Sequence, residues 1–236
     1  MEVTFLLPCL DEAESIGFCI DEIKAAIDRL GLSAEILVAD NGSADRSREI
    51  ALQNGARVVE LSDRGYGNAL KGGIQAAKGK YVIMGDCDGS YDFSHPERFL
   101  QALRSGAALV VGDRFAGGIA PGAMPLSHRI GVPLLSALAR WRFHTTVRDF
   151  HCGLRGFERE AALNLALQSP GMEFATELIA KFAQSGASIA QVPTPLRCDK
   201  RLGKSHLRTF RDGFRHLGYI MKNGGSKHET KNQRSG

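Results

Sequence analysis

Short apolar runs alternate with stretches of helical periodicity through the first 112 residues of the chain. The apolar runs are residues 3–7, 35–39, 57–61, 80–85 and 107–112. Between the first two runs, apolar side chains recur every three or four residues from Ile16 to Leu30, and Gly31 supplies a helix stop. Strands that alternate with helices of this length form βαβ units. The alternation therefore predicts an α/β fold with three layers, α/β/α, around a mainly parallel central sheet.

Local signals set the ends of some helices. Ser43 is placed to cap a helix that ends near Asn54. The sequence Ser94-His95-Pro96-Glu97 has the pattern of a capping box and is expected to open the helix after residues 80–85. Past Arg114 the pattern predicts a Gly/Pro-rich loop, then a helix, a strand, a second helix and a last strand. These elements are expected at residues 116–125, 127–143, 149–157, 173–185 and 188–192.

The chain shows no internal repeat and no clear linker, which predicts one domain over residues 1–222. A C-terminal amphipathic helix is expected over about 206–222. Residues 223–236 are polar and charged, so they are expected to be a disordered tail.

Acidic side chains follow the apolar run 80–85 directly, as Asp86, Asp88 and Asp92. Right-handed crossovers would bring this segment to one rim of the sheet, together with residues 8–12, 40–45 and 113–114. Clustered carboxylates repel one another, so a divalent cation is expected beside them. Mg²⁺ or Mn²⁺ held by one or two carboxylates completes its shell with substrate phosphate oxygens. A simple polar turn is the alternative interpretation of Asp-x-Asp alone.

Composition favours a globular protein without membrane spans. The chain is 43% hydrophobic and 24% charged, and no stretch reaches the ~20 apolar residues of a spanning helix. Because the first expected strand starts at once, neither a signal peptide nor a transmembrane helix is expected. Five scattered cysteines without a Cys-x-x-Cys pair argue against a disulfide framework or a zinc site. They favour a reducing cytoplasm.

Charge is divided unevenly along the chain. Residues 197–236 hold 11 Lys or Arg and 3 Asp or Glu, whereas the remaining residues hold 19 and 23. This basic segment indicates an anionic partner, namely phosphate, anionic lipid or nucleic acid. The helix within it carries an apolar stripe of Leu207, Phe210, Phe214, Leu217 and Met221 between basic residues. Such a helix either lies in a membrane interface or packs on its own core or a twin subunit.

Six motifs occur in a fixed order along the chain. They are Leu7-Pro8-Cys9-Leu10-Asp11-Glu12, Val38-Ala39-Asp40-Asn41-Gly42-Ser43-Ala44-Asp45, Asp86-Cys87-Asp88, Gly112-Asp113-Arg114-Phe115, Asp149-Phe150-His151-Cys152-Gly153-Leu154-Arg155 and Arg201-Leu202-Gly203-Lys204-Ser205. In this order they resemble family-2 GT-A glycosyltransferases, particularly the polyprenyl-phosphate (dolichol-phosphate) mannosyl- and glucosyltransferases. The resemblance runs from about Val3 to Met221 and implies a GT-A (Rossmann-like) fold.

The resemblance implies roles for residues on the side of a nucleotide-sugar donor. Asp40 would accept hydrogen bonds from the base, with N-capping as the alternative, and Asn41 leaves the choice of base open. Asp86 and Asp88 would hold Mg²⁺ or Mn²⁺ against the diphosphate, and Cys87 is expected to be a packed side chain. The other residues assigned to the donor are Pro8, Leu10, Glu12, Gly67, Lys71, Arg114, Arg201, Lys204 and Ser205, with a plain turn as the alternative for the glycine.

On the acceptor side the resemblance implies that Asp149 is the catalytic residue. As a base it would deprotonate or orient the acceptor in an in-line, inverting displacement. If the acceptor is already an ionised phosphate, Asp149 would mainly position it. The alternative is a structural ion pair of Asp149 with Arg155 or Arg148. His151 is expected to be structural.

The sequence thus predicts a metal-dependent, inverting hexosyltransferase. The expected donor is a GDP- or UDP-sugar, and the expected acceptor is a polyprenyl phosphate at the cytoplasmic face of a membrane. A glycosyltransferase for a small hydroxylated acceptor and a non-catalytic scaffold that binds sugar nucleotides remain alternatives. A nucleic-acid partner is not expected, and a homo-oligomer is left open.

Overall fold

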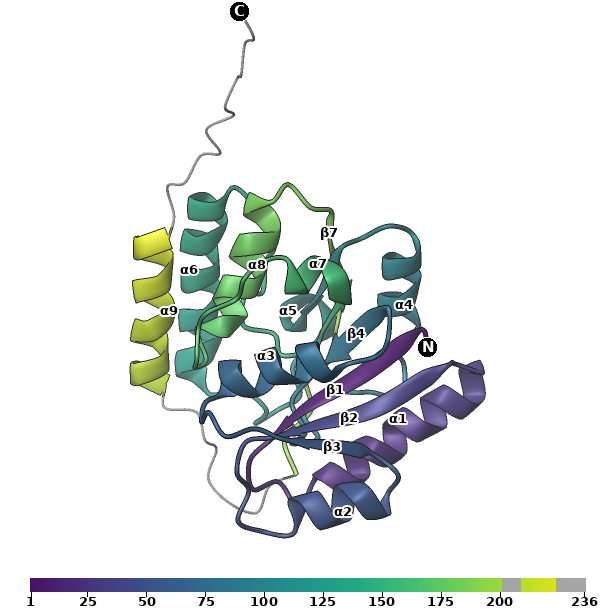
Figure 1. The fold of residues 1–236 in the computed structure, drawn as a ribbon. Helices are drawn as coiled ribbons and strands as arrows, with labels where there is room; N and C mark the ends of the chain where they lie inside the picture. Colours follow the sequence, from purple (N-terminus) through teal and green to yellow (C-terminus); the bar gives the residue numbers. More distant parts are fainter. Residues whose placement is uncertain (201–208, 224–236) are drawn as a thin grey trace, which may run out of the picture.

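The structure is a computed structural model that describes residues 1–200 and 209–223, and it places seven strands in one sheet (Figure 1). The strands are β1 (Val3–Cys9), β2 (Ala34–Asp40), β3 (Arg57–Glu60), β4 (Tyr81–Met84), β5 (Leu109–Asp113), β6 (Arg155–Glu158) and β7 (Ile189–Pro193). Their order across the sheet is β3-β2-β1-β4-β6-β5-β7. Every neighbouring pair is parallel except the two that β6 forms, with β4 and with β5. The predicted mainly parallel α/β sheet is therefore confirmed.

The register of the central strands sets the position of the polar rim. Cys9 lies beside Asp40, and Leu6 lies beside Met84. The carboxyl ends of β1, β2 and β4 therefore open toward the same edge of the sheet. All seven residues of β1 are buried, as expected for a central parallel strand covered on both faces.

Helices pack on both faces of the sheet, as Figure 1 shows. They are α1 (Ile16–Leu30), α2 (Ser47–Gln53), α3 (Tyr66–Ala76), α4 (Glu97–Arg104), α5 (Arg114–Gly117), α6 (Leu126–Phe143), α7 (Arg159–Leu163), α8 (Phe174–Gln184) and α9 (Thr209–Asn223). The helix α1 buries Ile16, Ile20 and Ile23 and ends at Gly31, which has a positive φ of 58°. This agrees with the predicted apolar spacing and helix stop.

Two predicted helix starts are wrong. The helix α2 begins at Ser47, because Asp45 accepts its backbone N–H, whereas the Ser43 hydroxyl accepts the N–H of Asp11 instead. The helix α4 begins at Glu97 without a side-chain cap, and the hydroxyl of Ser94 donates to Asp92. In both places a partner in the neighbouring loop outcompetes the local capping pattern.

Three helices, α6, α8 and α9, pack against one another. The helix α9 packs against α6 and α8, and Figure 1 shows the three lying together. The expected C-terminal helix is present as Thr209–Asn223, so Asn223 ends α9 and does not begin the predicted tail. Residues 206–208 and 224–236 lie outside the described residues. Within residues 1–200 and 209–223 we find no helix with the length and apolar character to cross a bilayer.

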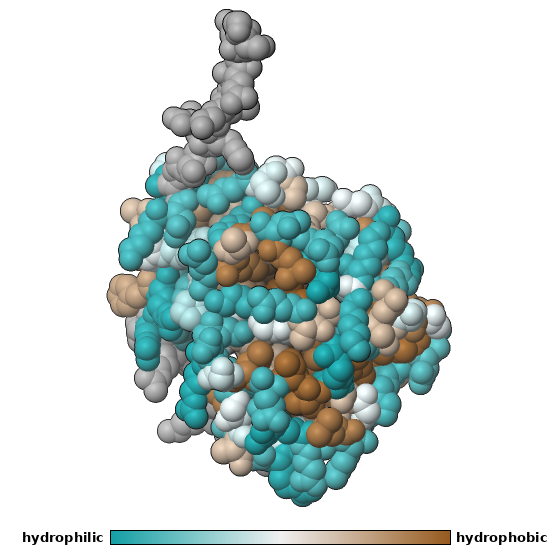
Figure 2. Space-filling view, viewed as in Figure 1, coloured by the Kyte–Doolittle hydropathy of each residue, from teal (hydrophilic) through white to brown (hydrophobic). Residues whose placement is uncertain are grey.

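Surface hydropathy differs between regions of the molecule. Hydrophilic side chains cover most of the face in Figure 2, with hydrophobic side chains gathered in separate patches. The large apolar side chains that are most exposed lie mainly on α6 and α9. On α6 they are Leu126, Ile130, Leu134 and Trp141, and on α9 they are Phe214 and Met221.

Candidate active site

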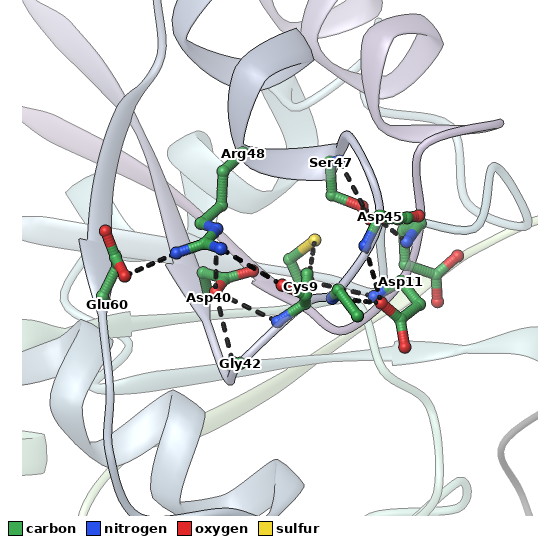
Figure 3. Close-up of polar contacts among 11 residues, drawn as sticks. Cys9, Asp11, Asp40, Gly42, Asp45, Ser47, Arg48 and Glu60 are labelled. Atoms are coloured by element: carbon green, nitrogen blue, oxygen red, sulfur yellow. Dashed lines mark hydrogen bonds and ion pairs between the residues drawn. The ribbon is translucent and has the colours of Figure 1, made fainter.

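Asp40 ends β2 at the polar rim, and its side chain is fully buried. Its Oδ2 accepts the backbone N–H groups of Gly42 and Ser43, both at 3.2 Å, and lies 3.8 Å from Nε of Arg48 (Figure 3). Its Oδ1 is buried without a hydrogen-bond partner among the described residues. A buried carboxylate oxygen without a donor is costly, so Oδ1 of Asp40 is an unsatisfied acceptor at the rim.

The loops after β1 and β2 interlock beside Asp40, as Figure 3 shows. Asp11, which has a positive φ of 55°, accepts the N–H groups of Ala44 and Asp45. Asp45 in turn accepts the N–H groups of Ala13 and Ser47. Burial alone would raise the pKa of Asp45, but its hydrogen bonds from Ser47 and Ala13 outweigh this and lower it. Both carboxylates are therefore occupied in building the loops.

The predicted donor residues of β1 lie next to Asp40. Pro8 pairs with Ala39 in the sheet, Leu10 is 36% exposed, and Glu12 is buried. The backbone N–H of Glu12 donates to the hydroxyl of Ser47 at 2.8 Å. The structure thus brings Pro8, Leu10, Glu12 and Asp40 to one corner of the rim.

The acidic loop after β4 lies two strands from Asp40. Oδ1 of Asp86 accepts the hydroxyl of Tyr66 at 2.9 Å, and Oδ1 of Asp88 accepts the N–H of Ser90 at 2.9 Å. Both aspartates are partly exposed. Cys87 is buried and donates to the carbonyl of Pro8, which confirms it as a packed side chain and ties this loop to β1.

Asp92 does not join Asp86 and Asp88. Its Oδ2 lies 2.6 Å from Nη2 of Arg197, and its Oδ1 accepts from Ser94. The expected three-carboxylate cluster is therefore a pair. No group of three or more His, Cys, Asp or Glu side chains within the described chain could hold a metal ion. Two carboxylates fit Mg²⁺ or Mn²⁺, which take the rest of their shell from phosphate and water.

Asp149 is fully buried and pairs with Arg114. Nε of Arg114 lies 2.6 Å from Oδ2, and Nη2 lies 2.8 Å from Oδ1. The predicted alternatives, Arg155 and Arg148, are wrong as partners. Arg155 instead donates to the carbonyls of Cys152, Phe150 and Ala175, and the described bonds of Arg148 include its N–H to Gln191. Both oxygens of this carboxylate are held by one guanidinium, which favours a positioning role.

His151 lies behind this pair and faces α9. Its ring contacts that of His216 edge-on at 4.4 Å, and neither of its nitrogens has a hydrogen-bond partner within the described residues. Burial lowers the pKa of His151 well below its ordinary value and lowers the pKa of His216 to about 4. His216 also shares a hydrogen bond with Thr176 at 2.8 Å. The expected structural role of His151 is consistent with this packing.

Other predicted donor residues have partners in the protein itself. A Cβ on Gly67 would lie 2.2 Å from the carbonyl oxygen of Ser169, so packing against that loop requires a glycine there. Lys71 donates to the carbonyl of Gln168. Donor contact by Gly67 and Lys71 stays a prediction. Arg201, Lys204 and Ser205 lie outside the described residues.

Two side chains at the site were missed from the sequence. Tyr66 reaches Asp86 from the first residue of α3, and burial together with the charge of Asp86 raises the pKa of the Tyr66 hydroxyl. Its place between Gly65 and Gly67 was the signal that could have found it. Arg197 reaches Asp92 from beyond β7, and no local pattern marks it.

Comparison with known proteins gives consistent matches. The family model for glycosyl transferase family 2 matches residues 4–165. The low-salt glycan biosynthesis hexosyltransferase Agl6 of Haloferax volcanii is 37% identical over 224 residues, which are 94% of this chain and 53% of Agl6. A dolichyl-phosphate hexose transferase of the same organism is 32% identical over 213 residues, 90% of this chain and 89% of that protein. This chain therefore spans about half the length of Agl6.

Among solved structures, glucosyl-3-phosphoglycerate synthase from Mycobacterium tuberculosis is similar over nearly the whole chain. Its complex with Mn²⁺, UDP and glucosyl-3-phosphoglycerate gives a TM-score of 0.72 at 25% identity, covering 97% of this chain and 81% of that one. A complex of the same enzyme with Mg²⁺ and UDP gives a TM-score of 0.72 at 24% identity. The likeness confirms the expected GT-A fold.

Proposed function

The chain belongs to glycosyl transferase family 2, and from that premise we propose that it is a metal-dependent, inverting hexosyltransferase that uses a nucleotide sugar. The proposal rests on Oδ1 of Asp40, which has no hydrogen-bond partner among the described residues. This buried acceptor lies at the same rim of the sheet as Asp86 and Asp88, which follow β4. β2 and β4 are both neighbours of β1, so their ends are about 10 Å apart. This is the scale of a nucleoside diphosphate lying across the rim.

On the donor side, Asp40 would accept an N–H from the edge of the base. Pro8, Leu10 and Glu12 surround the same corner and would contact the base and ribose. UDP is the nucleotide in the solved relative, and a GDP-sugar remains the other candidate donor. The 201–205 segment would supply Arg201, Lys204 and Ser205 to the diphosphate.

Asp88 and Asp86 would hold Mg²⁺ or Mn²⁺, the ions found with UDP in the solved relative. The ion would neutralise charge that develops on the departing nucleoside diphosphate. Tyr66 restrains Asp86 through its hydroxyl, which leaves Oδ2 of Asp86 facing the backbone near Gly153. Asp88 is therefore the better placed of the two for direct coordination.

Arg114, which the sequence assigned to the donor, pairs with Asp149, so we propose that the two act as one unit at the acceptor side instead. The guanidinium holds both oxygens of Asp149, so the pair would orient an acceptor that is already an anion more readily than deprotonate a neutral hydroxyl. An oxygen of the acceptor phosphate would attack the anomeric carbon in line as the bond to the diphosphate breaks. Arg129 on α6 is a further candidate for that phosphate.

A polyprenyl phosphate is the acceptor that we favour. The dolichyl-phosphate hexose transferase relative supports it. So do the exposed apolar side chains of α6 and α9, on helices that carry Arg129, Arg140, Arg142, Arg211, Arg215 and Lys222 against one acidic residue, Asp212. The protein would then act as a peripheral protein on the cytoplasmic face of a membrane. A small hydroxylated acceptor is the second candidate, since the solved relative was crystallised with glucosyl-3-phosphoglycerate.

Binding assays on an Asp40→Asn variant test the carrying observation. Asparagine keeps the size of the side chain but turns one acceptor into a donor, so it would face the N–H of the base with another N–H. UDP or GDP with Mn²⁺ should stabilise the wild type against heat, and the variant should bind the nucleotide ~10-fold or more weakly. Glu60→Gln, which alters an exposed partner of Arg48 in the same cluster, should bind as the wild type does. Equal binding by the Asp40 variant would refute the assignment.

The acceptor is tested with the nucleotide sugars that stabilise the protein. Transfer of labelled hexose to polyprenyl phosphate in vesicles, with little transfer to water-soluble phosphorylated or hydroxylated acceptors, is the expected outcome. The reverse preference would establish the second candidate. Binding of sugar nucleotides without any turnover would indicate the scaffold role.

A further inference from the structure

Residues 194–200 cross the rim after β7 and join two loops of the site. The N–H groups of Thr194 and Leu196 donate to the carbonyls of Asp113 and Gly118, at 3.0 and 2.9 Å. Two residues from the same stretch then bond to the loop that carries the metal-binding carboxylates. The N–H of Arg197 donates to the carbonyl of Ser90 at 2.9 Å, and that of Lys200 donates to the carbonyl of Asp88 at 2.8 Å. We call residues 194–200 the crossing segment.

The side chain of Arg197 fastens the crossing segment to two further elements. Its Nη1 lies 2.6 Å from Oε1 of Glu22 on α1, and its Nη2 lies 2.6 Å from Oδ2 of Asp92. Glu22 also accepts the N–H of Phe93, and Lys200 lies over the ring of Phe18 at 4.1 Å. Glu22 and Asp92 are 13% and 21% exposed, so these ion pairs are better shielded from solvent than typical surface pairs.

The loop that Arg197 fastens has no regular secondary structure between β4 and α4. Within this loop, Gly89 has a positive φ of 80° with the Lys200 side chain packed against it. The carboxylate of Asp88 is oriented by the backbone N–H of Ser90, and the carbonyl of Ser90 in turn accepts the backbone N–H of Arg197. Arg197 is thus connected to Asp88 through one intervening residue.

We infer that Arg197 is a positioning residue: by clasping Glu22 and Asp92 it holds the loop of Asp88 in the shape that binds a divalent cation and a nucleoside diphosphate. The inference rests on the proposed function, because it assigns that ion to Asp88. Arg197 itself touches neither ligand in this scheme.

If Arg197 acted on the metal through its charge alone, its removal would change the metal affinity in the opposite direction. A guanidinium near a metal site repels a divalent cation, so its removal would strengthen metal binding if charge alone mattered. Loss of a clasp would weaken metal binding instead, because the loop must then be ordered at the moment of binding. The direction of the change in metal affinity therefore separates the two roles.

The test measures the Mn²⁺ concentration that half-saturates binding of UDP or GDP, by calorimetry. Arg197→Met should raise this Mn²⁺ concentration about 10-fold, which corresponds to a loss of about 1.4 kcal/mol of binding free energy. Arg197→Lys keeps the charge but cannot bridge two carboxylates with one ammonium. Its half-saturating Mn²⁺ concentration should therefore rise nearly as much as that of Arg197→Met. Glu22→Gln should also raise the half-saturating Mn²⁺ concentration. Because it removes the charge of the partner and leaves Arg197 in place, it tests the same ion pair if an Arg197 variant folds poorly. Arg104→Met, which removes an exposed pair with Glu2 remote from the rim, is the control.

The possible outcomes distinguish a failure of this inference from a failure of the proposed function. Weaker Mn²⁺-dependent binding in all three clasp variants, with melting temperatures near that of the wild type, supports the inference. Tighter binding in Arg197→Met, or wild-type binding in Arg197→Lys, overturns it and leaves the proposed function standing. A wild-type protein that binds neither nucleotide with Mn²⁺ overturns both.

Discussion

The proposed donor and acceptor sides of the site are built differently. On the donor side, loop carboxylates accept backbone N–H groups, as Asp11, Asp45 and Asp88 do, and one oxygen of Asp40 stays open. On the acceptor side, Asp149 pairs with Arg114 and His216 shares a hydrogen bond with Thr176, while the ring nitrogens of His151 have no hydrogen-bond partner within the described residues. The carboxylates of the two sides are thus held differently, by backbone N–H groups at Asp11, Asp45 and Asp88 and by a guanidinium at Asp149.

This difference predicts how each side responds to mutation. On the donor side, removing a partly exposed carboxylate such as Asp88 should lower ligand affinity and leave the fold intact, because that side chain accepts an N–H from its own loop and is not part of the buried core. Changes on the acceptor side should alter turnover and stability together, because each removes one member of a buried pair.

The largest effect is expected for Asp88→Ala on the donor side. Removing the carboxylate best placed for the metal should lower transfer by two orders of magnitude or more, and EDTA should do the same to the wild type. Product formation with titrated Mn²⁺ measures it, and circular dichroism should show an unchanged fold. Full activity in excess chelator would contradict a metal role.

Asp149→Asn should have the next largest effect, on the acceptor side. Loss of charge leaves Arg114 without its counterion, so turnover should fall about 100-fold, and unfolding free energy should fall by about 3 kcal/mol. Affinity for the nucleotide should hold, as measured by calorimetry. Arg148→Gln, next in sequence but not paired with Asp149, should match the wild type. Lost nucleotide binding with normal turnover at saturation would place Asp149 on the donor side instead.

Sequence reasoning reached the donor side better than the acceptor side for a physical reason. Asp40, Asp86 and Asp88 directly follow strands, and parallel strands bring such residues to one rim whatever the rest of the chain does. Arg114 and Asp149 are 35 residues apart, and Arg197 lies 175 residues from Glu22. Pairings of this kind depend on tertiary packing. The antiparallel direction of β6, which no periodicity encodes, was missed for the same reason.

A smaller effect is expected at the exposed face of α6. Ile130→Glu with Leu134→Glu would place two charges among side chains that are 58% and 66% exposed, without disturbing the core. Binding to anionic liposomes should be lost, and transfer to polyprenyl phosphate in vesicles should fall several-fold, while nucleotide affinity is unchanged. Leu52→Glu on α2, at an equally exposed site away from this face, is the control. Equal binding of the wild type to neutral and anionic vesicles would oppose a membrane role.

The smallest effect is a pH dependence confined to the acceptor side. His216 has a pKa of about 4 in the folded protein, because it is buried and lies near Arg155 and Arg215, with Asp212 and Glu173 opposing them. The ordinary value is 6.5, so between pH 6.5 and pH 4 the unfolded chain binds a proton here that the native state does not. The free energy of unfolding should therefore be unaffected by this group above pH 6.5 and should fall by about 1–3 kcal/mol as the pH drops from 6.5 to 4.

Urea unfolding of the wild type and of His216→Gln at pH 7 and pH 5 measures this effect. Glutamine can keep the hydrogen bond to Thr176 and does not titrate, so the variant should lose less stability between the two values. Over the same range Asp45 stays ionised, since its hydrogen bonds lower its pKa, so the loops that it joins should keep their shape. Nucleotide binding at saturating Mn²⁺ should then persist at pH 5 while α9 and its contact with His151 weaken. If both proteins lost stability equally, the imidazole of His216 would not be the group that makes the acceptor side sensitive to acid.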